Sequence, residues 1–309
     1  MVTTMINITP KVDIVFKKLF GVEENKDLLI SLINSIVSEE DQVEDIKLLN
    51  PYNLQDYPIE KLSILDIKAK SKSGERYNIE IQIRDAKNYS KRALYNWAGL
   101  YKEQLKRGDG YEELKKAIGI HILNFVSIPG TDKYHNKFNM KNQDNEAVYF
   151  KEIELHTIEL KKFAENKTGQ KLSEDEEVNL FLGKIKTSLD RWVAFLSRCD
   201  LLESDKFPSS LKNPELEKAL SVLNVMSFDE KEREIYEGHL RWLRDEADAV
   251  LKAEEKGEKR GMEKGRAEGK AEGKAEGRAD LINAMLKNGM TKEQVSTATG
   301  LSISEIEKL

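Results

Sequence analysis

Two acidic residues occupy the polar face of a predicted β-hairpin, and their spacing suits them to binding a metal ion. Residues 62–70 and 77–84 both alternate apolar and polar side chains, and residues 72–74 between them are typical of a short turn. If the turn is centred on residue 73, antiparallel pairing places Asp66 directly across from Glu80. Like charges in that position destabilise a sheet, whereas a divalent cation between them is coordinated by both. The pair therefore predicts a metal site.

The chemistry of such a site would be that of a hard cation. Mg²⁺ prefers an octahedron of oxygen ligands and usually keeps several waters, which suits two carboxylates, the main-chain carbonyl of Ile81 and a phosphate oxygen. A metal held in this way activates water and offsets negative charge on phosphate. Spacing alone leaves an alternative open, an ordinary solvated hairpin face on which Lys68, Lys70 and Arg84 balance the two acids.

The segments around the hairpin predict an α/β core. Thr9 and Pro10 suit the N-cap and first position of a helix, and apolar side chains then recur at helical spacing as far as Phe20. The other elements expected before residue 173 are a second helix near 28–36, a strand at 43–49, a helix at 94–105, a buried strand at 117–128, a polar loop at 131–143 and one or two strands within 148–160. Beyond Ser173 the apolar pattern is helical throughout.

A four-residue repeat follows these helices. Between residues 257 and 277 glycine occupies every fourth position, with Lys or Arg, Ala and Glu between. Glycine costs roughly 1 kcal/mol against alanine inside a helix, so an isolated helix would be weak here unless another copy of the chain pairs with it. A solvated, partly helical linker is the alternative. After the repeat, residues 291–294 and 302–305 have the pattern of capping boxes, which predicts a small helix-turn-helix-like tail that serves either DNA binding or helical interaction.

Composition limits the function classes. The net charge of −5 provides no global positive field, so any nucleic-acid contact must be local, as in residues 84–107, which contain seven basic and two acidic residues. One cysteine, Cys199, rules out an internal disulfide framework and favours a reducing compartment. No apolar run approaches the roughly 20 residues that cross a bilayer. We expect a cytoplasmic protein with no membrane partner.

Four segments of the chain together resemble a known family. They are residues 9–21 (TPKVDIVFKKLFG), 65–69 (LDIKA), 78–82 (NIEIQ) and 92–97 (RALYNW). In this order they resemble the Rpn family of recombination-promoting nucleases, often labelled putative transposases. The resemblance extends from about Thr9 to Leu251 and includes residues 158–163 (IELKKF) and 192–196 (WVAFL).

The resemblance implies a PD-(D/E)xK nuclease fold, with a mixed central sheet flanked by helices. It also implies an enzyme that cuts DNA with Mg²⁺, with Mn²⁺ as a substitute. Asp66 would be the motif aspartate and Glu80 the motif acid, both as metal ligands, while Gln82 stands where the wider superfamily usually has lysine. Lysine can orient water and stabilise negative charge, whereas glutamine is neutral and can only form hydrogen bonds. The metal would then carry more of the activation.

The resemblance also suggests roles for neighbouring residues. Asp13 matches the family's acid on the first helix and would bind the metal, directly or through water; a favourable interaction with the helix dipole is the alternative. Arg84, Lys91, Arg92 and Tyr95 are candidates for nucleic-acid binding, against simple exposure to solvent.

Four regions follow from these patterns. We predict a PD-(D/E)xK nuclease-like core at 1–172, a helical C-terminal subdomain at 173–251, the repeat linker at 252–280 and the tail at 281–309, with homo-oligomerisation through the repeat and tail.

Three functional hypotheses remain open at this level. The first is a metal-dependent DNA endonuclease linked to recombination or mobile elements. The second is a non-catalytic DNA-binding or scaffolding protein derived from a nuclease fold, in which Gln82 marks lost activity. The third is a nuclease toxin or phage-defence effector, which could act on RNA. Zinc chemistry is unsupported because the four histidines lack metal-ligand spacing.

Overall fold

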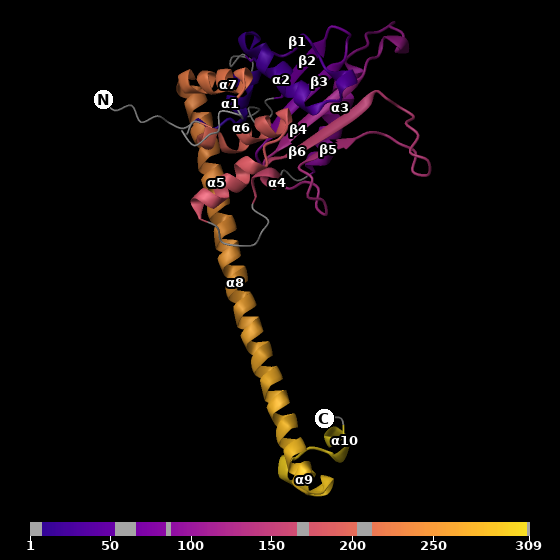
Figure 1. Cartoon of the computed structure of the whole chain (residues 1–309). Coiled ribbons are helices and arrows are strands. Elements are labelled where there is room, and N and C mark those ends of the chain that lie inside the picture. Colours follow the sequence, from indigo (N-terminus) through magenta and orange to yellow (C-terminus); the bar gives the residue numbers. More distant parts are fainter. Residues whose placement is uncertain (1–7, 53–65, 85–87, 166–172, 203–211, 308–309) are drawn as a thin grey trace, which may run out of the picture. The chain divides into compact units, whose positions relative to one another are not determined.

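The computed structural model describes residues 8–52, 66–84, 88–165, 173–202 and 212–307. A six-stranded mixed sheet forms its centre, in the order β1-β2-β3-β4-β6-β5 (Figure 1). The strands are β1 (Ile46–Leu48), β2 (Ile67–Ser71), β3 (Arg76–Gln82), β4 (Ala117–Leu123), β5 (His135–Phe138) and β6 (Ile153–Glu159). The pairs β3–β4 and β4–β6 are parallel, and the other neighbours are antiparallel. The predicted α/β class with a mixed sheet is confirmed.

The β2–β3 hairpin has the predicted register. Ile67 pairs with Ile79 and Lys68 with Asn78, and one further step in the same register places Asp66 across from Glu80. Asp66 itself immediately precedes β2, and residues 62–65, the first part of the predicted strand, lie outside the described residues. The turn at residues 72–74 contains Gly74 with a φ of 109°, a conformation that L residues rarely adopt.

Helices surround the sheet. Helix α3 (Tyr89–Lys102) connects the parallel strands β3 and β4 and packs on both. Helix α1 (Asp13–Phe20) also packs on β3, and it forms a contiguous group with α2 (Lys26–Ile36), α6 (Ser188–Leu202) and α7 (Pro214–Val225). The buried side chains Phe16, Phe20 and Trp192 fill the centre of this group, with Trp192 packed edge-on against Phe20. Two shorter helices are α4 (Leu160–Ala164) and α5 (Glu174–Gly183).

One long helix contains the repeat. Helix α8 (Glu230–Lys287) is continuous, and the small helices α9 (Lys292–Thr299) and α10 (Ile303–Ile306) pack at its C-terminal end (Figure 1). Both predicted capping boxes are present, at Thr291 and at Ser302. Ile282, Val295 and Ile306 form a small core that holds these three elements together.

The chain divides into two compact units, residues 1–239 and 240–309. The predicted boundaries at 251/252 and 280/281 both fall within α8. Among the described residues, no helix is long and apolar enough to pass through a bilayer.

Two local predictions were wrong. The first helix begins at Asp13 with Val12 as its N-cap, because Pro10 and Lys11 form a turn before it, so Thr9 does not cap it. The segment 131–143 was expected to be a loop, yet it contains β5. This four-residue strand is polar and half-exposed at the sheet edge, so it lacks the apolar alternation that marks an inner strand.

Candidate metal and nucleic-acid site

The polar face of the hairpin is buried beneath α3. Strand alternation sends Tyr77, Ile79 and Ile81 to one face of β3 and Glu80 and Gln82 to the other, and both of these polar residues are buried, Glu80 to 2% exposure. A crossover helix between two parallel strands must cover one face of the sheet, and here α3 covers the face that carries Glu80. The solvated-face interpretation is therefore wrong for Glu80 and Gln82.

Arg92 on α3 binds the two polar residues of β3 at once. Its guanidinium donates to Glu80 Oε1 at 2.8 Å and to the side-chain oxygen of Gln82. The Gln82 amide nitrogen in turn donates to the Arg84 carbonyl at 3.1 Å, and the guanidinium lies 5.0 Å from the Tyr89 ring centroid. Arg92 thus fixes the orientation of the Glu-x-Gln motif, an arrangement that the prediction of a phosphate contact did not include.

Three acids in this region have raised pKa values. The pKa of Asp13 is raised to about 7, mainly by burial and to a smaller extent by the charge of Glu80. Burial is also the largest cause of the raised pKa values of Asp66 and Glu80, and the charge of Asp66 contributes to the shift of Glu80. Arg92 and Asn96 oppose the shift at Glu80. Charge effects thus connect Asp13 with Glu80 and Glu80 with Asp66, and a negative charge at such buried positions is costly unless it is compensated.

Two carboxylate oxygens there lack hydrogen-bond donors. Among the described residues, Asp13 Oδ1 and Glu80 Oε2 are buried without a donor. Buried carboxylate oxygens are normally paired or bound to metal, so these atoms fit a cation. No three His, Cys, Asp or Glu side chains among the described residues are grouped closely enough to hold one ion together. A cation here would therefore be held by one or two carboxylates and water rather than by a closed protein cage, a coordination that suits Mg²⁺.

Lys17 contacts the site from α1, and the sequence patterns did not identify it. It lies one helical turn after Asp13 and is completely buried. Its Nζ donates to the main-chain carbonyl of Asp66, which also accepts from Asn50 Nδ2 at 3.1 Å. Burial lowers the pKa of Lys17 to about 8, against the raising effect of Asp66. In the sequence, the only indication of a role for Lys17 is its spacing of four residues from Asp13, which places both side chains on one face of α1.

His121 and Tyr89 lie behind Glu80. His121 pairs with Glu80 across β4 and β3, and its Nδ1 is 3.9 Å from Glu80 Oε2 and 2.9 Å from the Tyr89 hydroxyl. Burial lowers the pKa of His121 to about 4, so this imidazole is neutral at pH 7. The Tyr89–His121 pair therefore adds no charge next to Glu80.

A pocket of about 390 Å³ opens beside Asp66. Lys68 and Lys102 contribute cations to it, Glu103 contributes an acid, and Lys68 Nζ is 3.4 Å from Glu103 Oε2. The remaining lining residues are Tyr95, Asn96, Ala98 and Gly99 of α3. Two lysines and two acids, Asp66 and Glu103, thus line this pocket, so its formal charges balance.

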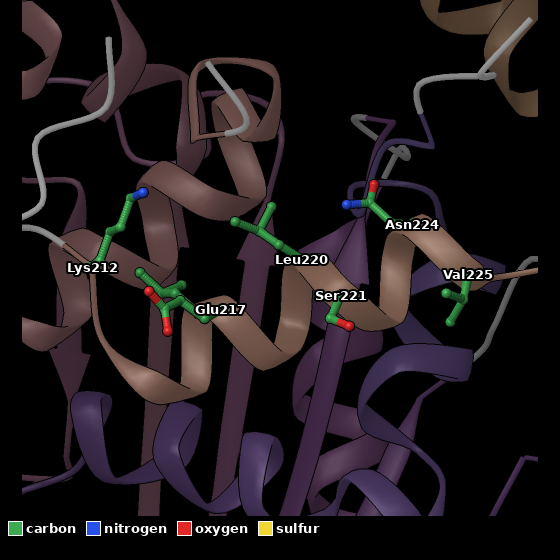
Figure 2. A pocket seen from close by; sticks show the side chains of 7 residues that line it. Lys212, Glu217, Leu220, Ser221, Asn224 and Val225 are labelled. Carbon is green, nitrogen blue, oxygen red and sulfur yellow. The ribbon is translucent and has the colours of Figure 1, made fainter. Parts of the chain in front are cut away.

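A second hollow, of about 330 Å³, lies along α7 (Figure 2). Leu216, Leu220 and Val225 provide its apolar surface, and Glu217 is the one acid among its described lining residues. It therefore lacks the paired carboxylates that a metal site of this kind requires.

The other candidate residues occupy different positions. Arg84 and Lys91 are exposed, and the Tyr95 side chain is 80% exposed on α3 beside the pocket. Ile81 lies between Glu80 and Gln82, beyond the last β2–β3 pair at Ile79. The contribution of its carbonyl to a metal remains a prediction.

A mixed six-stranded sheet flanked by helices is consistent with the PD-(D/E)xK nuclease fold. The chain belongs to the PD-(D/E)XK nuclease family transposases, because the model of that family matches residues 10–253. Nucleases of this kind generally use divalent metal ions. Neither the curated proteins nor the solved structures include a match to the chain.

Proposed function

We propose that this protein is a divalent-metal-dependent endonuclease that hydrolyses DNA phosphodiester bonds, in a setting of recombination or mobile elements. The observation that carries the proposal is the hairpin register that places Asp66 across from Glu80. Both acids have raised pKa values, and Asp66 lines a pocket that also contains Lys68 and Lys102. Acids that lie close together at buried positions, where their negative charges are energetically unfavourable, are typical of a functional site.

Asp66 and Glu80 would hold the cation, with the Ile81 carbonyl and Asp13 as further oxygen donors, Asp13 through water. A bound Mg²⁺ or Mn²⁺ lowers the pKa of water and offsets charge on the scissile phosphate. Arg92 keeps Glu80 and Gln82 in one orientation, so the carboxylate needs little rearrangement to bind. Gln82 carries no charge, so the positive charge near the phosphate comes from Arg92 and from Lys68 and Lys102 on the pocket walls.

The direct test is cleavage of supercoiled plasmid by the purified protein with Mg²⁺, compared with D66A and E80A. We expect cleavage by the wild type and none by either variant, with D144A, a change of an exposed loop acid, as the matched control. Cleavage that persists in D66A and E80A would exclude this site as its source.

A non-catalytic DNA-binding or scaffolding role is the second candidate. It is favoured by one observation, the neutral Gln82 at the position where PD-(D/E)xK enzymes usually have lysine. Calorimetry separates the two: absence of Mg²⁺ and Mn²⁺ binding, together with salt-dependent DNA binding, would support the scaffold over the enzyme. An RNA substrate, as in a toxin or defence nuclease, would use the same acids and is tested by replacing the plasmid with RNA.

We also propose that the protein self-associates in parallel through α8. From Gly265 to Asp280, residues four apart differ by about 40° around the helix, so glycines, cations, alanines and acids form four separate ridges. The glycine ridge has the cations on one side and the acids on the other. Two parallel copies that meet through their glycines bring cations against acids, whereas antiparallel copies bring like charges together.

A further inference from the structure

Asp66 is fastened to the fold by side chains rather than by the sheet. It precedes the first residue of β2, so it is not part of the β2–β3 ladder. Its carbonyl accepts hydrogen bonds from Lys17 Nζ and from Asn50 Nδ2, while Asn50 Oδ1 accepts from the Lys68 main-chain N–H at 2.6 Å. These three contacts fix the position of the Asp66 main chain, and hence the point from which its carboxylate side chain extends.

The burial of Lys17 has a cost that its contacts only partly explain. Burying a lysine is expensive unless the ammonium is paired. Lys162, the comparable buried lysine of α4, donates to the Ile128 carbonyl and forms an ion pair with Glu159. Lys17 likewise donates to a carbonyl, but no described acid forms a salt bridge with it, and Asp66 is the acid whose charge acts on it. The ammonium is therefore directed at Asp66.

We propose that Lys17 is a positioning residue for Asp66. Lys17 supplies a positive charge from α1, whereas β3 carries the neutral Gln82. Lys17 holds the Asp66 main chain so that the carboxylate faces Glu80, and its fixed charge offsets the repulsion between the two acids. The inference rests on the proposed function, because it treats Asp66 as a metal ligand. Residues that orient metal ligands in this way commonly change metal affinity about ten- to a hundredfold when they are replaced.

The test is calorimetric titration of Mn²⁺ into the full chain carrying K17M, with thermal melting of each protein. Methionine keeps the length and apolar stem of lysine and removes the ammonium. We expect K17M to melt as a folded protein and to bind Mn²⁺ about tenfold or more weakly. K162M is the matched control and should bind Mn²⁺ as the wild type does. N50A removes the second donor to the same carbonyl and should weaken binding by a smaller factor.

The outcomes separate this inference from the proposed function. If the wild type binds Mn²⁺ and D66N does not, Asp66 is a ligand; equal or tighter binding by K17M would then overturn the role of Lys17, since loss of a merely repulsive cation would favour the metal. If K17M does not fold, N50A decides the question, and wild-type affinity in N50A overturns the proposal. If the wild type binds no Mn²⁺, the proposed function fails first and the inference fails with it.

Discussion

The nuclease-like core and helix α8 contain the same kinds of charged side chain but place them in opposite environments. In the core, Glu80 and Lys17 are buried, and their positions are fixed by Arg92 and Asp66. From residue 251 to 278 of α8, every side chain that the structure describes is exposed, and the Lys264–Glu268 pair at 3.6 Å is typical of surface ion pairs that contribute little.

This difference shows which charged residues indicate a function, namely those that are buried. A buried acid or cation costs several kcal/mol unless something specific compensates it, so its presence in a fold points to a function or a partner. An exposed repeat of acids and cations costs almost no free energy, so its function can be inferred only from the pattern of its residues. If this contrast holds, changes in the core should affect the chemistry, and changes in α8 should affect only the assembly.

The largest expected effect is on cleavage. The isosteric variants D66N and E80Q remove charge but little volume, and loss of a metal ligand should reduce cleavage by roughly a thousandfold or more, equivalent to about 4 kcal/mol of transition-state stabilisation. Deletion of residues 257–309 should leave nicking activity within a few-fold of the wild type. Plasmid nicking rates measure both, and a deletion that is as inactive as D66N would contradict the proposed division of roles.

The second prediction concerns pH and stability. The pKa of Asp13 is about 7 in the folded protein against an ordinary 3.8, so the folded state binds this proton more tightly than the unfolded state does. Its contribution to stability is therefore complete below pH 4 and is lost as pH rises to about 7. D13N cannot ionise, so its free energy of unfolding should exceed that of the wild type increasingly over this range, by at most roughly 4 kcal/mol at pH 8.

Urea unfolding of D13N and wild type at pH 4.5 and pH 8, without metal, measures this effect. D144N is the control, because Asp144 is an exposed loop acid. An equal pH slope in D13N and the wild type would show that Asp13 is not the source of the electrostatic cost.

The sequence predicted the hairpin and the opposition of Asp66 and Glu80 because both follow from local rules, alternation along the strands and a short turn around Gly74. The capping boxes at Thr291 and Ser302 were equally local and are confirmed. Burial of the polar face was not predictable from alternation, since a strand pattern is the same whether solvent or α3 covers it. The Lys17–Asp66 contact joins residues 49 positions apart, and only the packed fold reveals it.

Histidine gives a second example of this limit. The four histidines have no metal-ligand spacing in the sequence, yet His135 and His156 are stacked, with Nε2 and Nδ1 2.9 Å apart, and His156 continues to Glu154 at 2.7 Å. Glu154 also meets Lys116 and Lys137, each at 2.9 Å. This buried network joins β5 and β6, and the segment that supplies β5 had been predicted to be a loop. Because the edge strand β5 was not predicted, the charge network through its residues was not predicted either.

The third prediction concerns the tail. Ile282 is completely buried in a small core whose other buried members among the described residues are Val295 and Ile306, with four partly buried apolar residues packed against them. I282A should cost about 3 kcal/mol, which so small a core cannot absorb, so α9 and α10 should unfold locally. Hydrogen exchange should show loss of amide protection at residues 292–306, while the melting temperature of the core stays unchanged. I303A, an exposed isoleucine on α10, is the matched control.

The smallest effect per residue is expected in the glycine ridge. Whether alanine there lowers the mass of the protein in solution distinguishes the two interpretations of α8. A Cβ added at Gly265, Gly269, Gly273 or Gly277 meets nothing within 4 Å, so alanine at each should stabilise the helix by roughly 1 kcal/mol. Circular dichroism of the fourfold alanine variant should therefore show equal or greater helicity. If copies pair closely through the glycines, the added methyl groups separate the helices, and light scattering should show a lower mass than for the wild type even though the helix is more stable. An unchanged mass, with the helicity raised, would instead mean that the repeat is a solvated single helix, and then the contrast with the core would be complete, because α8 would hold neither chemistry nor assembly.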